Sequence, residues 1–202
     1  MGRDDGQAFP VYIAVIAGLL FLAFAYFLVG QAALTRNSAQ TAADAAALAA
    51  AQDARERLRD GWIKVILDPG QWNSFLQGEA NTGDSPCQQA EEFAARNEAT
   101  LTGDKCVRLT TGEHGFKVTV STTGREPDDA TASAEAVVEP RCSFDPPKPP
   151  ESPPPSPDGG EGEPDGEDPA VDLLCGDEQW VIDLENPSLP SAADLFRVRL
   201  SN

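Results

Sequence analysis

Few side chains in this sequence of 202 residues are arranged so that they could converge on one site for acid–base chemistry. The single histidine, His114, lies between two glycines in a predicted hairpin tip, and no neighbour in the sequence would orient it as a general base or metal ligand. The adjacent carboxylates Glu91–Glu92 and Asp128–Asp129 stand side by side, whereas the paired acids of a glycosidase face each other across a cleft. We therefore expect all of these groups to be solvated.

Other signatures of catalysis are missing from the sequence. It contains no G-x-S-x-G, no phosphate-binding loop, no H-E-x-x-H and no G-x-G-x-x-G, and its acidic stretch lacks the ligand spacing of a calcium loop. Three tryptophans could form a sugar-stacking platform, but core aromatics of a small domain are the favoured interpretation. They are Trp62, Trp72 and Trp180. We predict a protein that is not an enzyme and uses no cofactor or metal.

Four cysteines carry the remaining chemistry, and all of them follow a long apolar run near the N-terminus. None forms a C-x-x-C pair, which disfavours a zinc site. Their even number favours two disulfides outside the cytoplasm, although four reduced thiols buried in a cytosolic domain are the alternative. Of the three possible pairings we favour Cys87 with Cys106 and Cys142 with Cys175, because each pair brackets a loop.

The charge of the chain limits its partners. Lys and Arg number 15 against 33 Asp and Glu, which gives a net charge of −18. Nucleic-acid binding and adhesion to anionic lipid both need clustered basic residues, and the sequence has no such cluster. We expect no nucleic-acid partner, and attachment to a membrane must be hydrophobic.

The apolar run, residues 8–33, contains no charged residue and predicts a transmembrane helix. At ~1.5 Å per residue it exceeds the ~30 Å hydrocarbon core of a bilayer. The competing interpretation is a cleaved secretory signal, whose apolar region would be only ~7–15 residues long. Membrane lipid is therefore a predicted partner, and residues 1–7 are a short leader. Within the run, Ala14 and Gly18 form a small-x-x-x-small pair of the kind that packs helices in membranes.

The helical pattern continues beyond the membrane. Residues 34–60 are rich in alanine, the strongest helix former, and contain no proline, and Gly61 is the expected stop. Small side chains on one side would let another helix approach closely. A stalk that holds a domain off the bilayer and a surface for helix–helix assembly both remain open on physical grounds. The small side consists mainly of Ala43, Ala47, Ala51 and Ala54.

The rest of the chain predicts a small α+β domain. Residues 61–142 form its first part, with a second helix from Ser85 to about Leu101. Residues 143–170, rich in proline, glycine and acid, are typical of a disordered loop, and residues 171–202 add C-terminal strands. We expect one antiparallel sheet that packs on the second helix and on the outer half of the first. Its strands are expected at 106–110, 116–122, 132–139, 179–184 and 195–200.

Three consecutive features carry a family resemblance: "GQAF" near the N-terminus, the uninterrupted apolar helix, and "RNSAQTAADAAALAAAQ" after it. Together they resemble the TadE/TadG-like proteins of Flp (tight adherence) pilus assembly. The most specific element is "AADAAALAAA", residues 42–51. The resemblance implies a type IV pilin-like organisation with a cytoplasmic N-terminus, one pass through the cell membrane and an extracytoplasmic domain. It also implies partners: a secretion ATPase, platform proteins, a prepilin peptidase, and similar pilin-like helices that pack laterally.

The resemblance further implies a processing site. Prepilin peptidases cut after a glycine, and their substrates usually have glutamate as the fifth mature residue. Gly6 and Gln7 would flank such a cut, and the fifth position is then Val11. This departure favours a membrane-anchored assembly factor or minor pilin over a major filament subunit.

The sequence therefore predicts a single-pass, non-enzymatic, pilin-like component of Flp pilus assembly. The alternative is a membrane-tethered extracytoplasmic module that binds cell-wall polymer or a protein partner. A hydrolase is the least favoured function.

Overall fold

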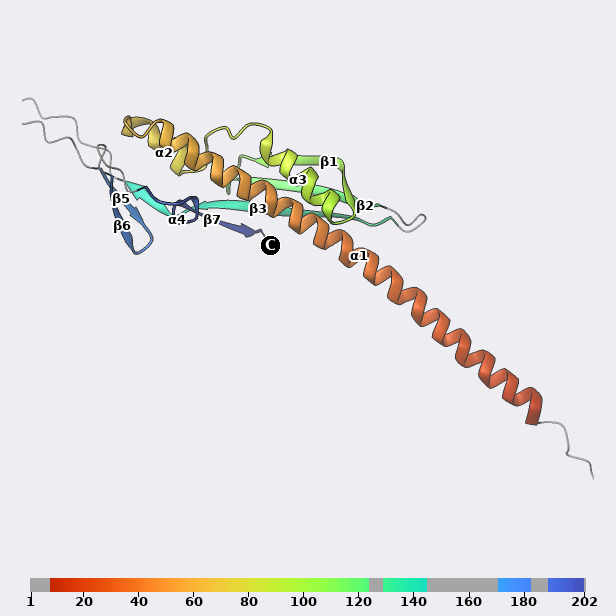
Figure 1. Cartoon of the computed structure of the whole chain (residues 1–202). Coiled ribbons are helices and arrows are strands. Elements are labelled where there is room, and N and C mark those ends of the chain that lie inside the picture. The colour runs from red at the N-terminus through yellow and green to blue at the C-terminus, as the bar shows by residue number, and fades with distance from the viewer. Residues whose placement is uncertain (1–7, 124–128, 145–170, 183–188, 202) are drawn as a thin grey trace, which may run out of the picture.

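The computed structural model describes residues 8–123, 129–144, 171–182 and 189–201 (Figure 1). The predicted leader, with Gly6 and Gln7, and nearly all of the predicted loop 143–170 lie outside these residues. The described part is α+β, as expected: one long N-terminal helix is followed by shorter helices and antiparallel strands.

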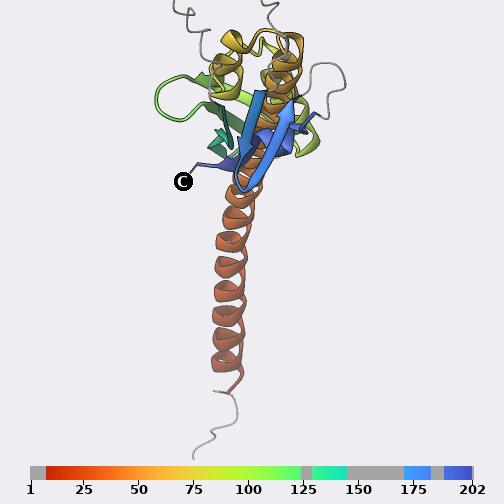
Figure 2. The ribbon, with the colours of Figure 1, turned by 90° about the vertical axis from the view of Figure 1, so that its left-hand side faces the viewer.

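The first helix, α1, runs without interruption from Ala8 to Lys64. Its N-terminal half projects from the domain, and its C-terminal half forms part of it (Figures 1 and 2). The helix passes through the expected stop at Gly61. A Cβ at this position would collide with the ring of Phe75, so the glycine permits close approach of the next segment and does not end the helix.

A short reversal follows α1. The Asp68 carboxylate accepts the Gly70 N–H (3.2 Å) and caps a 3-10 turn, Pro69–Gln71. The five-residue helix α2, Trp72–Leu76, comes directly after it. The chain is thus turned back toward the membrane-proximal end of the domain, where the next helix can lie beside α1 (Figure 1).

Helix α3 spans Ser85–Arg96 and lies along α1. Its buried alanines, Ala90 and Ala94, are as small as those of α1. The helix ends earlier than the expected Leu101 because Glu98 adopts a left-handed φ of 54°, which a right-handed helix cannot include.

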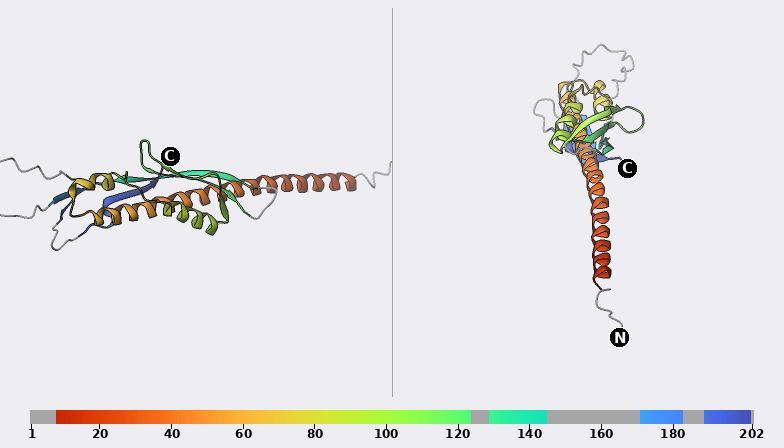
Figure 3. Two further views of the ribbon diagram at one scale, coloured as in Figure 1. Left: turned by 90° about the horizontal axis from the view of Figure 1, so that it is seen from above. Right: turned by 90° about the vertical axis from the view of Figure 1, so that its right-hand side faces the viewer.

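Four antiparallel strands form the main sheet in the order β1-β2-β3-β7. Phe116, Val118 and Val120 of β2 are buried at every second position, whereas Lys117, between the first two, faces solvent and pairs with Glu135 of β3 (2.9 Å). The long helix covers the buried face (Figure 3). The strands are β1 Ala99–Leu109, β2 Gly115–Thr122, β3 Thr131–Pro140 and β7 Phe196–Leu200.

A second sheet of three strands, in the order β4-β5-β6, corrects the expectation of a single sheet. The expected strand 179–184 corresponds to β6 of this sheet. The two sheets separate after Pro140, which has no N–H to continue a ladder, and the N–H of the next residue, Arg141, donates to the carbonyl of Leu195 (2.9 Å). The strands are β4 Cys142–Phe144, β5 Val171–Cys175 and β6 Glu178–Ile182.

A single helical turn, α4, Ala192–Leu195, leads into β7. The Asp194 carboxylate accepts both the hydroxyl (2.7 Å) and the N–H (2.8 Å) of Ser191. These bonds hold the pKa of Asp194 below its ordinary value. The cap therefore stabilises the folded state fully above the ordinary carboxyl pKa and is lost as the pH falls through the lowered one.

The alanine-rich half of α1 is the centre of the core. The main sheet and α3 lie on different sides of it (Figure 3). Small side chains around most of a helix let a sheet and a second helix both approach closely. The buried alanines of this half are Ala39, Ala42, Ala43, Ala46, Ala47, Ala49, Ala50, Ala51 and Ala54.

This arrangement corrects the sequence-based interpretation of the small side of α1. The sheet was expected to pack on this half of the helix, as it does, but the side with Ala43, Ala47, Ala51 and Ala54 was expected to serve an exposed stalk or to meet another molecule. All four are at most 3% exposed within their own chain. An alanine surface fits an intramolecular neighbour as well as an intermolecular one, so the sequence pattern alone could not identify the partner.

Enlarging one of these alanines should destabilise the fold. Ala50 is fully buried, and Ala50→Leu forces α3 and the sheet apart, so we expect a loss of about 1–3 kcal/mol of unfolding free energy. The control is Ala95→Leu on the exposed side of α3, which should change it by less than about 0.5 kcal/mol. Chemical unfolding of the full chain in detergent measures both, and equal effects would contradict the proposed core.

Candidate functional site

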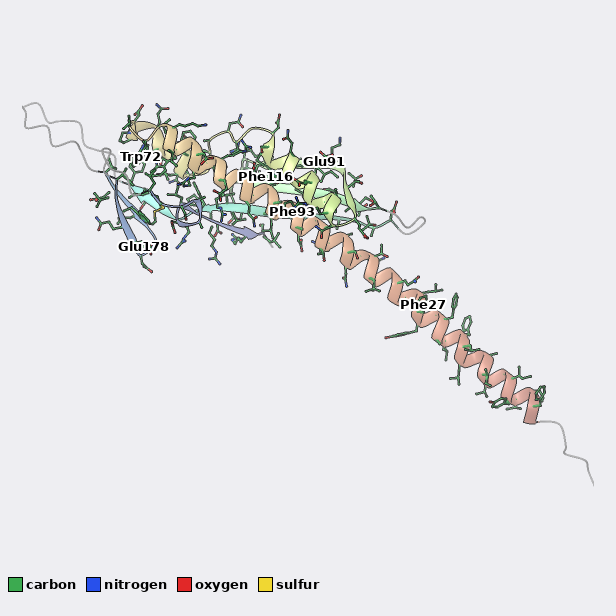
Figure 4. All side chains as sticks on the ribbon, viewed as in Figure 1. Phe27, Trp72, Glu91, Phe93, Phe116 and Glu178 are labelled. Atoms are coloured by element: carbon green, nitrogen blue, oxygen red, sulfur yellow. A yellow bond between two sulfur atoms is a disulfide. The ribbon has the colours of Figure 1, made fainter. Side chains whose placement is uncertain are left out.

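The N-terminal half of α1 is apolar and bare, in the sense that no other described element packs on it. Its large side chains are exposed on every side, among them Tyr12 (64%) and Tyr26 (83%), and Phe27 has no neighbouring element (Figure 4). Among the described residues, α1 is the one helix long and apolar enough to cross a membrane, and none of its apolar stretch is buried.

Lipid is the medium that suits this surface. Residues 8–33 span about 39 Å as a helix, more than the ~30 Å hydrocarbon core, and the first charged residue after them is Arg36. A monomeric protein in water rarely exposes so large an apolar area. The structure and the composition together indicate a membrane-associated protein.

The predicted packing pair lies on this bare half. Ala14 and Gly18 are both exposed, and a Cβ built on Gly18 would meet no atom within 4 Å. Because they are four residues apart they share one helix face. The space beside them is open to a second helix, and their role in packing stays a prediction.

The two disulfides join the favoured pairs of cysteines. Cys87 of α3 is bonded to Cys106 of β1, and Cys142 of β4 to its register partner Cys175 of β5. The first bond ties α3 to the main sheet, and the second ties together two strands of the small sheet. Disulfides of this kind persist in oxidising compartments.

Two of the three tryptophans belong to the core and form no exposed platform. Trp62 and Trp72 are fully buried and meet edge to face with ring centroids 5.3 Å apart. Trp72 also contacts Phe144 and donates its indole N–H to the carbonyl of Val65 (3.1 Å). Trp180 of β6 is half-buried. This cluster joins the small sheet to the end of α1.

His114 is not the solvated tip residue that the sequence predicts. It is half-buried directly before the first residue of β2, and its Nδ1 is buried without a hydrogen-bond partner in the described part of the chain. It lines a cavity of about 10 Å³ together with Thr82 and Arg108. Burial lowers the pKa of Arg108, whose guanidinium donates to three carbonyls of the loop after α2, including that of Ala80 (2.6 Å). Arg108 is therefore held by backbone carbonyls. No carboxylate is among the described residues that line the cavity beside His114.

The acidic pairs do not converge on a site. Glu91 and Glu92 are exposed on α3, and Glu92 forms an ion pair with Arg96 one turn later. Asp128 lies outside the described residues and Asp129 is exposed. Within the described ranges, no three histidines, cysteines or acids are close enough together to hold a metal ion.

No sequence pattern predicted the polar hollow that lies where α1 enters the domain. Its lining comes from α1, the end of α3 and the end of β2, including Thr35, Arg96 and Thr123. These segments are distant along the chain, so no local pattern could have joined them. The one sequence signal for this hollow is the group of polar residues, 35–38, that follows the apolar run.

Comparison with known proteins identifies the N-terminal segment. Residues 6–53, about a quarter of the chain, match the family model for TadE/G-like proteins of Flp pilus assembly. No curated protein and no solved structure matches the chain significantly. The family resemblance expected from the sequence is thereby confirmed for this segment, which contains both the bare apolar half of α1 and most of its buried alanines.

Loss of the second disulfide should loosen the small sheet. Cys142 and Cys175 are 33 residues apart in sequence, so replacing both with serine should lower the unfolding free energy by about 3–4 kcal/mol by the loop-entropy model. Non-reducing peptide mapping of the wild-type chain checks the pairing first, followed by unfolding of the double variant. A Cys87–Cys142 or Cys106–Cys175 peptide would contradict the fold.

Proposed function

We propose that this chain, whose N-terminal segment is that of a TadE/G-like protein, is a non-enzymatic assembly factor or minor pilin of the Flp pilus system. It is held by one membrane pass, with a cytoplasmic N-terminus and its disulfide-bonded domain outside the cell membrane. The observation that carries the proposal is that the two halves of the single helix α1 have different environments. One half is a bare apolar span, and the other half is the core of the domain.

Rigid coupling between anchor and domain suits an assembly role. Between the span and the first fully buried alanine, Ala39, the chain is continuous helix without glycine or proline. A flexible linker would let the domain reorient freely, whereas this helix makes the domain follow the tilt and rotation of its span. A component that must present its surface at a defined height among other helices benefits from that constraint.

The use of the reactive side chains supports a non-enzymatic role. The cysteines are paired, Trp62 and Trp72 fill the core, and Arg108 binds backbone carbonyls. The burial of two tryptophans also weakens the case for a cell-wall binding module that stacks on sugar rings.

Membrane topology tests the proposal. We expect the protein to remain with membranes after alkaline washing, because an apolar helix of this length partitions strongly into lipid. Protease added to the outer side of intact spheroplasts should digest the domain, and a cytoplasmic marker should survive as the control. Intact-mass measurement of the N-terminus decides whether the chain is cut after Gly6. Recovery of a soluble form that begins near residue 35 would overturn the proposal.

Lateral packing through the span can be tested separately. The new thiol of Ala14→Cys should form a disulfide with that of a second copy of the variant when membranes are oxidised, because Ala14 and Gly18 leave room for close approach of its helix. The matched control is Ile16→Cys, which lies about 200° around the same helix. Mass spectrometry of the crosslinked species identifies the partner. Equal crosslinking at both positions would argue against a specific face.

A further inference from the structure

The polar hollow at the membrane-proximal end of the domain has a volume of about 490 Å³. Its walls come from three elements: Thr35 and Ser38 on α1, Arg96 and Glu98 at the end of α3, and Thr123 just after β2. Neither the family match nor the proposed assembly role assigns it a ligand.

The hollow lies at the depth of lipid headgroups if α1 crosses the membrane. Thr35 and Ser38 follow the last residue of the apolar run, Ala33, by about 3–8 Å along the helix. The headgroup layer on each side of the hydrocarbon core is about 5–8 Å thick. Leu34, which also lines the hollow, is 67% exposed beside the span. A lipid whose chains lie against α1 would thus bring its headgroup to this wall.

Acceptor atoms dominate one wall of the hollow. The hydroxyls of Thr35 and Ser38 donate to carbonyls one turn earlier on α1 (3.2 and 3.0 Å), and the Thr123 hydroxyl donates to the Glu98 carbonyl (3.0 Å). Each hydroxyl has one proton and two lone pairs, so these groups are left as acceptors. Together with the Glu98 carboxylate they suit a cation that can donate several hydrogen bonds.

Arg96, which precedes Glu98 by two residues in the sequence, brings a positive charge to the same hollow. The Arg96 guanidinium is held by Glu92 and lies over the ring of Phe93, 4.8 Å from its centroid. It has five N–H donors, so the contact with Glu92 leaves donors for a phosphate. Glu98 and Arg96 therefore offer opposite charges within one hollow, which matches a ligand that carries both an ammonium and a phosphate.

We propose that this hollow binds the headgroup of a phosphatidylethanolamine-type lipid, with the ammonium on the Glu98 side and the phosphate on the Arg96 side. The proposal rests on the membrane anchor proposed above. A choline headgroup cannot donate hydrogen bonds to the acceptor wall, and a glycerol headgroup lacks the cation. The net charge of −18 also disfavours anionic lipid. The bound lipid would fix the height of the domain on the bilayer.

Lipid retention by the full chain tests the proposal. The protein is reconstituted into phosphatidylcholine vesicles that contain equal parts of phosphatidylethanolamine and phosphatidylglycerol, then extracted gently and weighed by native mass spectrometry. We expect phosphatidylethanolamine to be retained several-fold above either other lipid. Arg96→Gln and Glu98→Gln should each remove this preference. Glu91→Gln, which makes the same change of charge on an exposed residue of α3 outside the hollow, should keep it.

The outcomes separate this proposal from the membrane anchor. Flotation with vesicles of any composition reports the anchor alone, and a chain that does not float overturns both. A chain that floats but retains the three lipids equally, or prefers phosphatidylglycerol, overturns only the headgroup site. So does a preference that survives both lining variants. Binding of soluble glycerophosphoethanolamine as tight as binding of the whole lipid would show a site for a free solute and would also overturn it.

Discussion

The tight contact of α1 with the sheet on one side and α3 on another is the constraint on which the rest of the structure depends. Only small side chains allow both neighbours to come this close to one helix, and Ala42 to Ala54 supply them. The Cys87–Cys106 bond ties α3 to the sheet, so the two neighbours of α1 cannot separate freely. The same closeness accounts for Gly61, where any side chain would collide with Phe75.

One continuous helix carries two different surfaces, and this couples the domain rigidly to the apolar stretch. Up to Ala33 its large apolar side chains are exposed, and from Ala39 onward most of its alanines are buried. The change takes place within about two helical turns, where Arg36 and Asn37 face outward. Any tilt of the span is therefore passed directly to the domain. The polar hollow lies at this junction, where lipid and domain meet.

Much of the architecture could be predicted from local patterns, and the failures have a common cause. Continuous helicity and the alternation in β2 are expressed by residues near one another in sequence, and the cysteine pairing followed from the loops that the cysteines bracket. The small sheet was missed because β4 and β5 are short and become strands only by pairing with each other across residues 145–170. His114 was misplaced because its burial comes from the loop after α2 and from β3, both distant in sequence.

The sequence by itself determined the character of the N-terminal helix. The helix begins with an uncharged run long enough for a bilayer and continues as an alanine segment typical of TadE/G-like proteins. Only the tertiary structure decided what the alanines contact. Alanine offers a smooth, close surface to any partner, so its pattern predicts close packing without naming the neighbour. The folded chain supplies that neighbour itself, whereas the apolar span and the polar hollow beside it stay open to other molecules.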